Sequence, residues 1–112
     1  MSDVEMTERL QAFVEDHPDG WNHEHWLGLL GSLEGEGVDV SDQEHIGLAL
    51  ERARLETTLR AKGVQGLGPK RIQAVVDRFE TLWNLRHASA AEIAEIPTVP
   101  AALARKVREA LN

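Results

Sequence analysis

The segment from Val64 to Arg71 combines residue types that are suited to binding an anion. It reads Val-Gln-Gly-Leu-Gly-Pro-Lys-Arg. Glycine lets the backbone turn tightly, and proline fits the first position of a helix, where a backbone N–H has no intrahelical acceptor. The free amides at a helix start carry positive partial charge and bind anions. With Lys70 and Arg71 beside them, we expect a nucleic-acid phosphate as ligand. The alternative is a tight, well-capped connection between two helices.

The charge distribution supports the first interpretation. The 112-residue chain has a net charge of -7, which by itself argues against a polyanionic ligand. Residues 60–112, however, contain nine cationic and five acidic side chains, a net charge of +4, whereas residues 1–59 contain three and fourteen, a net charge of −11. This asymmetry predicts a basic functional module at 59–112 that follows an acidic region at 1–58 in the sequence. We expect the two to form one continuous fold.

Composition limits the remaining possibilities. The chain has no cysteine, which excludes disulfides, thiolate metal sites and cysteine nucleophiles and fits a reducing compartment. No apolar run approaches the roughly 20 residues that span a bilayer, and the acidic start lacks the pattern of a signal peptide. We therefore expect a soluble cytoplasmic protein that does not enter a membrane.

Hydrophobic residues recur at helical spacing throughout, and no sustained alternation indicates a strand. We expect an all-α protein in which a C-terminal unit packs on about three N-terminal helices. The third of these begins at the capping box of residues 41–44, ends at Gly63 and is central, contacted from two sides. A second capping box at residues 89–92 opens a short helix. The apolar positions that define the helices are Leu10, Phe13, Val14, Trp26, Leu29, Leu30, Leu33, Ile46, Leu48, Ala49, Leu50, Ala53, Leu55, Leu59, Ile72, Val75, Val76, Phe79, Ile93, Ile96, Leu103, Val107, Ala110 and Leu111.

An internal repeat divides the C-terminal half. A shift of 32 residues superposes residues 64–68 on residues 96–100, and Val75 on Val107. Two helix-turn-helix units in tandem are the simplest interpretation, since one such unit is too small to bury both of its apolar faces.

Residues from about 59 to 111 resemble a tandem helix-hairpin-helix domain, and the likeness is closest to the C-terminal DNA-binding domain of the bacterial excinuclease ABC protein C family. The resemblance rests on residues 66–71, Phe79, residues 81–82 and 88–93, the Ile96-Pro97 pair and residues 102–107. In that family two hairpins present backbone amides to phosphates, mostly without regard to base sequence. The resemblance implies that Gly66, Leu67 and Gly68 supply amides here and that Lys70 and Arg71 supply charge.

The second hairpin departs from the family pattern. Thr98 and Pro100 occupy its glycine positions. Because proline donates no amide and threonine does not readily take a positive φ, we expect this hairpin to contact phosphate less well. Its contacts would come from Thr98, Arg105 and Lys106. The nuclease modules of the excinuclease are absent, so incision activity is not expected to transfer.

Other residue groups point to no chemistry. Histidines 17, 23 and 25 lack the spacing of a metal site, and the acidic residues 34–44 lie around a loop and a helix start, where carboxylates are common. We predict no cofactor, no metal and no enzymatic activity. Trp26 and Trp83 are expected in the core, while Trp21 could stack on bases.

The leading hypothesis is thus a non-catalytic DNA-binding module that holds double-stranded or junction DNA by its backbone. The rival is a protein-interaction or dimerisation module of a DNA-processing complex. An enzyme that uses the acidic half is a third, weaker alternative.

Overall fold

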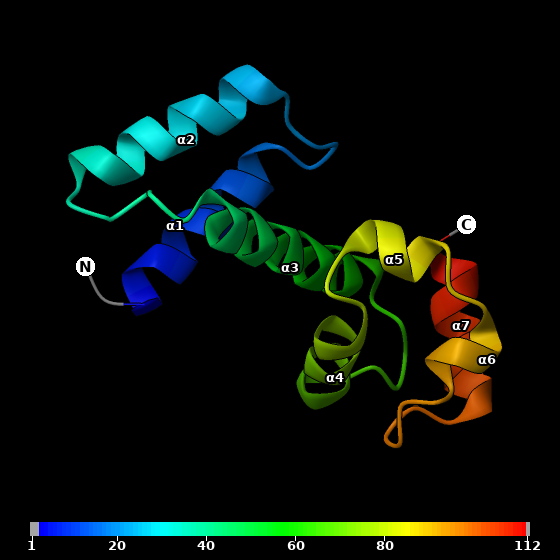
Figure 1. Cartoon of the computed structure of the whole chain (residues 1–112). Helices are drawn as coiled ribbons and strands as arrows, with labels where there is room; N and C mark the ends of the chain where they lie inside the picture. The colour runs from blue at the N-terminus through cyan, green and yellow to red at the C-terminus, as the bar shows by residue number, and fades with distance from the viewer. Residues whose placement is uncertain (1–2, 112) are drawn as a thin grey trace. The chain divides into compact units, whose positions relative to one another are not determined.

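Helices account for all the regular structure in residues 3–111, which are the residues that the computed structural model describes, with side chains from residue 6 onward. The order is α1 (Asp3–Asp16), α2 (His23–Gly35), α3 (Gln43–Lys62), α4 (Pro69–Phe79), α5 (Leu82–Arg86), α6 (Ala90–Ile93) and α7 (Ala101–Ala110), as Figure 1 shows. The predicted all-α class is confirmed.

The chain divides into two compact units, residues 1–53 and 54–112. The division lies inside α3, five residues before the boundary at residues 58 and 59 that charge and motif predicted. Each unit has its own core, and α3 supplies both: Ile46 and Leu50 belong to the first cluster, Leu55 and Leu59 to the second. Different segments of α3 therefore serve different cores, and that is why its apolar surface is wider than one narrow stripe requires.

The core of the first unit is formed by the apolar faces of α1, α2 and the first part of α3. Leu10 and Val14 of α1, Leu29, Leu30 and Leu33 of α2, and Ile46 and Leu50 of α3 are its buried members. Trp21 and Trp26 are partly buried against this cluster.

The starts of α2 and α3 are capped by side chains. At α3 the capping residue is one position later than predicted: the Asp42 side chain, not that of Ser41, accepts from the amide of His45 at 3.0 Å. The Ser41 amide instead donates to Asp39 Oδ1 at 2.9 Å, and these contacts with Ser41 lower the pKa of Asp39. The acidic residues here thus satisfy backbone amides locally.

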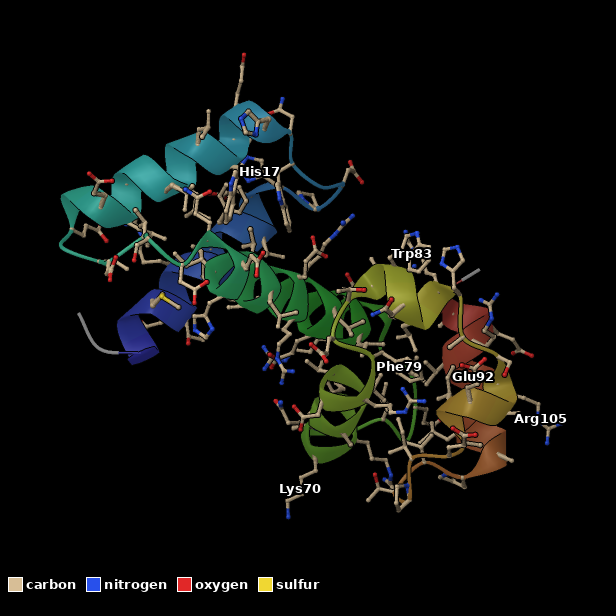
Figure 2. The ribbon with its side chains drawn as sticks, in the orientation of Figure 1. His17, Lys70, Phe79, Trp83, Glu92 and Arg105 are labelled. Carbon is tan, nitrogen blue, oxygen red and sulfur yellow. The ribbon has the colours of Figure 1, made fainter. Side chains whose placement is uncertain are left out.

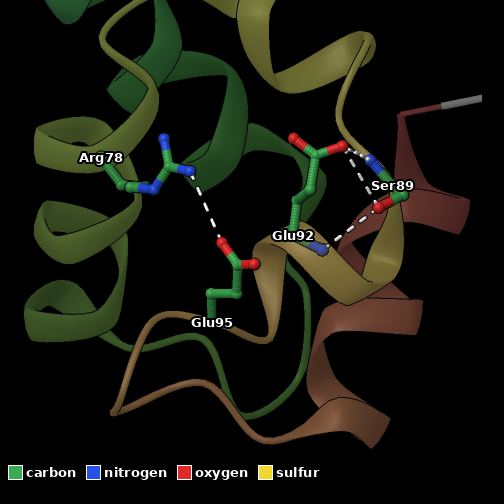
Figure 3. Close-up of polar contacts among 4 residues, drawn as sticks. All are labelled: Arg78, Ser89, Glu92 and Glu95. Atoms are coloured by element: carbon green, nitrogen blue, oxygen red, sulfur yellow. Dashed lines mark hydrogen bonds and ion pairs between the residues drawn. The ribbon is translucent and has the colours of Figure 1, made fainter.

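The second unit repeats one pattern twice. Its buried residues come in equivalent pairs 32 positions apart, Leu67 with Val99 and Val75 with Val107. Helix α6 lies against α7 (Figure 1). The capping box that opens α6 is confirmed: the amide of Glu92 donates to Ser89 Oγ at 3.1 Å, and Glu92 Oε1 accepts from the Ser89 amide at 3.3 Å (Figure 3). The predicted repeat is therefore present in the packing as well as in the sequence.

Helix α4 ends at an unusual residue. Glu80 has φ 66° and is the one non-glycine residue with positive φ in the described part of the chain. Two groups fix this turn by donating to the carbonyl of Phe79: the Thr81 amide at 2.7 Å and Asn84 Nδ2 at 2.8 Å. Thr81 then caps α5, its Oγ1 accepting from the Asn84 amide at 3.0 Å. The turn sends the chain sharply from α4 into α5.

Candidate functional site

The first hairpin turn is closed by its own backbone. The Leu67 amide donates to the Val64 carbonyl at 3.0 Å, and the Leu67 side chain is buried. Gly66 has φ +93°, a conformation that other residues rarely adopt, and a Cβ there would lie 3.5 Å from Leu103 Cδ1 of α7. Leu67 therefore holds the turn together, and its amide already has an acceptor.

The start of α4 has no side-chain cap. Gly68 is the capping residue, with φ −78° and ψ 178°, and Pro69 is the first helical residue. The Ile72 amide donates to the Gly68 carbonyl at 2.9 Å, so the first intrahelical bond begins there. Because proline has no N–H, the amides of Lys70 and Arg71 are the ones left without an intrahelical acceptor. Position 68 does not require glycine. Its φ of −78° is open to any residue, and a Cβ there would meet nothing within 4 Å.

The second hairpin has the same turn hydrogen bond and the same kind of helix start despite its different residues, although Thr98 lacks the positive φ of Gly66. The Val99 amide donates to the Ile96 carbonyl at 2.9 Å, as the Leu67 amide does to Val64. Pro100 caps α7 with φ −70° and ψ 162°, also without a side-chain cap. The Ala104 amide donates to the Pro100 carbonyl at 2.9 Å. Pro100 thus replaces Gly68 without changing the backbone.

This geometry corrects the reasoning about the missing glycines. Thr98 has no positive φ, so no glycine is required at that position. Pro100 lies before the helix, where it removes one amide but leaves those of residues 101–103, which have no intrahelical acceptor. At the first hairpin, Pro69 is the first residue of the helix and Gly68 is the capping residue. The second helix start is therefore as open as the first, although it lacks an adjoining pair of cations.

Arg71 connects the two hairpins. Its Nε donates to the Thr98 carbonyl at 2.7 Å and its Nη1 to the Gly66 carbonyl at 3.1 Å. One guanidinium group therefore fixes the spacing of the two turns, while the side chain stays exposed. The sequence indicated only its charge, and no local pattern signals the bond to Thr98, which is 27 residues away.

A shallow groove of about 570 Å³ lies between the two turns. Gly68, Pro69, Lys70, Arg71 and Thr98 line it. Four of the predicted site residues therefore meet at one place, and Lys70 extends from the start of α4 away from the helices (Figure 2). The lining of the groove is mostly apolar, but it includes Lys70 and Arg71, whose cationic side chains and uncapped amides favour an anion.

Arg105 and Lys106 lie elsewhere. Both are exposed on α7, in its second turn, and neither lines the groove. Figure 2 shows Arg105 on the outer side of α7, directed away from α4. The structure does not bring these two predicted residues to the groove.

Two acidic side chains of the second unit are engaged by other groups of the same unit. Glu95 pairs with Arg78 at 3.7 Å, and Glu92 caps α6 (Figure 3). The guanidinium of Arg78 also lies 5.0 Å from the centre of the Phe79 ring. None of these carboxylates lines the groove, so the positive charge of Lys70 and Arg71 is not neutralised there.

The prediction that Trp83 belongs to the core is wrong. Its side chain is 66% exposed, because α5 is a single short turn whose inner face is filled by Leu82 and Leu85. Trp26, also predicted in the core, is partly buried there. Trp21 is half-buried and lies edge-on to Phe13, with ring centres 5.3 Å apart, so it is not an open stacking surface.

The histidines of the first unit form a packed pair. His17 and His25 have ring centres 4.5 Å apart, and His25 also caps the start of α2. Within residues 3–111, no group of three or more histidine, aspartate or glutamate side chains is placed to hold a metal ion. Nor is any helix in this range long and apolar enough to cross a membrane.

Comparison with known proteins finds relatives of the second unit. Residues 59–112 match the family model described as a SAM-like helix-hairpin-helix tandem. Curated relatives include the UvrABC system protein C of Proteus mirabilis (35% identical), of Photorhabdus laumondii (36%) and of Symbiobacterium thermophilum (41%). The matches cover 70%, 65% and 53% of this chain but only 16%, 13% and 9% of those proteins. No solved structure matches the chain.

Proposed function

We propose that this chain is a non-catalytic DNA-binding protein that holds backbone phosphates at the groove between its two hairpins. The observation that carries the proposal is the pair of uncapped helix starts, at α4 and α7, whose preceding turns are joined by Arg71 beside Lys70. Such amides and cations bind phosphate oxygens but carry no information about base sequence. The match of residues 59–112 to the tandem helix-hairpin-helix family model and the likeness to a UvrABC system protein support DNA as the polyanion.

The hairpins make unequal contributions in this proposal. The first offers the amides of Lys70 and Arg71 together with their charges, and the second offers the amides of residues 101–103 alone. Arg71 ties the turns together, so both helix starts approach one duplex as a unit. We therefore expect phosphates of both strands to be contacted, with the larger share of the binding free energy at the first hairpin.

The three lysines of the chain provide a matched test. Lys62, Lys70 and Lys106 are all exposed, and only Lys70 lines the groove. Lys70→Gln should weaken binding to any duplex sequence and lower the slope of log affinity against log salt by about 1. Lys62→Gln and Lys106→Gln should have smaller effects. Equal losses in the three variants would show that binding follows net charge and would contradict the groove as the site.

The amides can be observed directly. In an NMR titration with a short DNA duplex, we expect the largest shifts at the amides of Lys70 and Arg71 and smaller ones at residues 101–103. Shifts confined to the first unit would refute the site. Supercoiled plasmid incubated with the protein and Mg²⁺ should remain uncut, and reproducible nicking would refute the non-catalytic part of the proposal.

A protein-interaction or dimerisation module is the second candidate function. Two leucines of the first unit favour it: Leu27 on α2 is 52% exposed and Leu48 on α3 is 41% exposed. Burying the exposed half of each side chain against a partner would contribute about 1 kcal/mol. Analytical ultracentrifugation across a concentration series would reveal a dimer, and Leu27→Glu with Leu48→Glu should dissociate it if these leucines form the interface.

A further inference from the structure

The exposed Trp83 is held in a defined orientation. Its indole ring stacks on the His87 imidazole, with ring centres 3.9 Å apart and planes 24° from parallel. His87 is itself fixed, because its Nδ1 donates to the Trp83 carbonyl at 2.8 Å. One face of the indole is thus covered by a ring that the backbone holds in place, and 66% of the side chain remains exposed. In Figure 2 the ring stands out from α5.

The surroundings of Trp83 are polar and cationic. Asn84, Arg86 and His87 are all exposed beside it, and Arg86 and His87 lie three and four positions further along, on the same side of the chain. Trp83 is the single exposed large hydrophobic residue among the described residues of the second unit. The core of a protein-protein interface is usually a contiguous apolar patch, and none surrounds Trp83. A lone aromatic ring beside a cation is instead the composition of a site that stacks a nucleobase.

We propose that Trp83 and His87 form a stacking platform for an unpaired nucleobase, with Arg86 beside the phosphate of the same strand. The occupant is one nucleotide of a single-stranded segment. The inference goes beyond the proposed function, in which the hairpins contact phosphates only. Stacking on an aromatic ring accepts any base, because every base has a π face, so the platform adds affinity for unpaired strands without adding sequence preference.

The test compares two labelled single strands of about 12 nucleotides, within the usual length of a single-strand site. One strand is intact, and the other is abasic, with the same phosphates but no bases. The wild-type protein should bind the intact strand more tightly by fluorescence anisotropy. Trp83→Ala should weaken binding to the intact strand by about fivefold to a hundredfold and leave the abasic strand unaffected.

Two further substitutions separate stacking from general hydrophobicity. Trp83→Phe keeps an aromatic face and should retain most of the preference for the intact strand, whereas Trp83→Leu keeps an apolar side chain and should lose it.

Several outcomes would overturn the platform. Equal affinity of the wild-type protein for intact and abasic strands would do so, as would unchanged binding by Trp83→Ala. A dimer that Trp83→Ala dissociates would show that a second copy covers the ring instead. The platform and the hairpin site fail separately: Lys70→Gln tests duplex binding and should leave the ratio of intact to abasic affinity unchanged.

Discussion

Replacing Gly68 by serine should raise the stability of the protein and lower its affinity for DNA. Gly68 caps α4 with φ −78° and ψ 178°, has no side-chain cap, and leaves room for a Cβ. A serine hydroxyl at this position accepts from the third helical amide, which is that of Arg71. Serine at a helix cap stabilises by a few tenths of a kcal/mol over glycine, and replacing glycine where φ allows a side chain stabilises by about 0.4–1 kcal/mol, chiefly by stiffening the unfolded chain. Because the two figures describe overlapping contributions, we expect a total gain of about 0.5–1 kcal/mol.

The same hydroxyl occupies the anion site. If the amides of Lys70 and Arg71 bind a phosphate, the serine removes one donor and places a side chain where the phosphate lies. A hydrogen bond to a charged group contributes about 1.5–3 kcal/mol. The affinity for duplex DNA should therefore fall by about tenfold or more. Opposite signs for stability and affinity cannot arise from a general loss of structure.

Both quantities are measured on the same protein sample. Thermal unfolding should show a midpoint raised by about 2–8 °C, from the usual relation for a domain of this size. Anisotropy titrations with a labelled duplex at one fixed salt concentration give the affinity. The matched substitution Pro100→Ser at the equivalent position of α7 tests the second hairpin. A Gly68→Ser protein that is more stable and binds DNA as tightly as the wild type would refute the phosphate site at α4.

Three other substitutions test the hairpins and the turn that follows α4. Gly66→Ala should lower the free energy of unfolding by about 1 kcal/mol, because the φ of +93° disfavours a Cβ; an unchanged urea midpoint would contradict that conformation. Arg71→Lys keeps the charge but cannot bond the carbonyls of both Gly66 and Thr98, so the affinity for duplex DNA should fall about fivefold or more. Lys70→Arg should bind duplex DNA nearly as tightly as the wild type. Equal affinities of the two variants would mean that only charge matters. Glu80→Gly should raise the free energy of unfolding by about 0.5–1 kcal/mol, because the relief of backbone strain at φ 66° exceeds the entropic cost of glycine. A lower urea midpoint for this variant would show that Glu80 is not strained.

Much of the helical layout could be predicted from local signals. The end of α3 at Lys62 follows from Gly63, which has φ +59°. The capping box at Ser89 and Glu92 has the predicted bonds, because both partners lie within one turn. At α3 the same reasoning failed by one residue, since Asp42 as well as Ser41 offers an oxygen at the helix start. Short-range patterns identify a cap but do not choose between adjacent candidates.

The candidate site was predicted in part. The hairpin segment and its resemblance indicated Gly66, Gly68, Lys70 and Arg71, and the groove brings the last three together. The sequence did not reveal that the Leu67 amide is already bonded to Val64. It also suggested that Pro100 impairs the second hairpin, because the residue type was compared without the backbone. In the structure both capping residues have extended backbone, which proline adopts as readily as glycine.

By itself, the sequence determined which segments are helices, where the two hairpins lie and that charge is divided between the halves of the chain. Those features depend on residue spacing and on hydrogen bonds within a few residues. The tertiary structure alone decided that Arg71 joins the hairpins across 27 residues. It also decided that Trp83 is exposed to solvent and stacked on His87. Burial and long-range bonds depend on which surfaces meet once the helices pack, and no pattern along the chain contains that information.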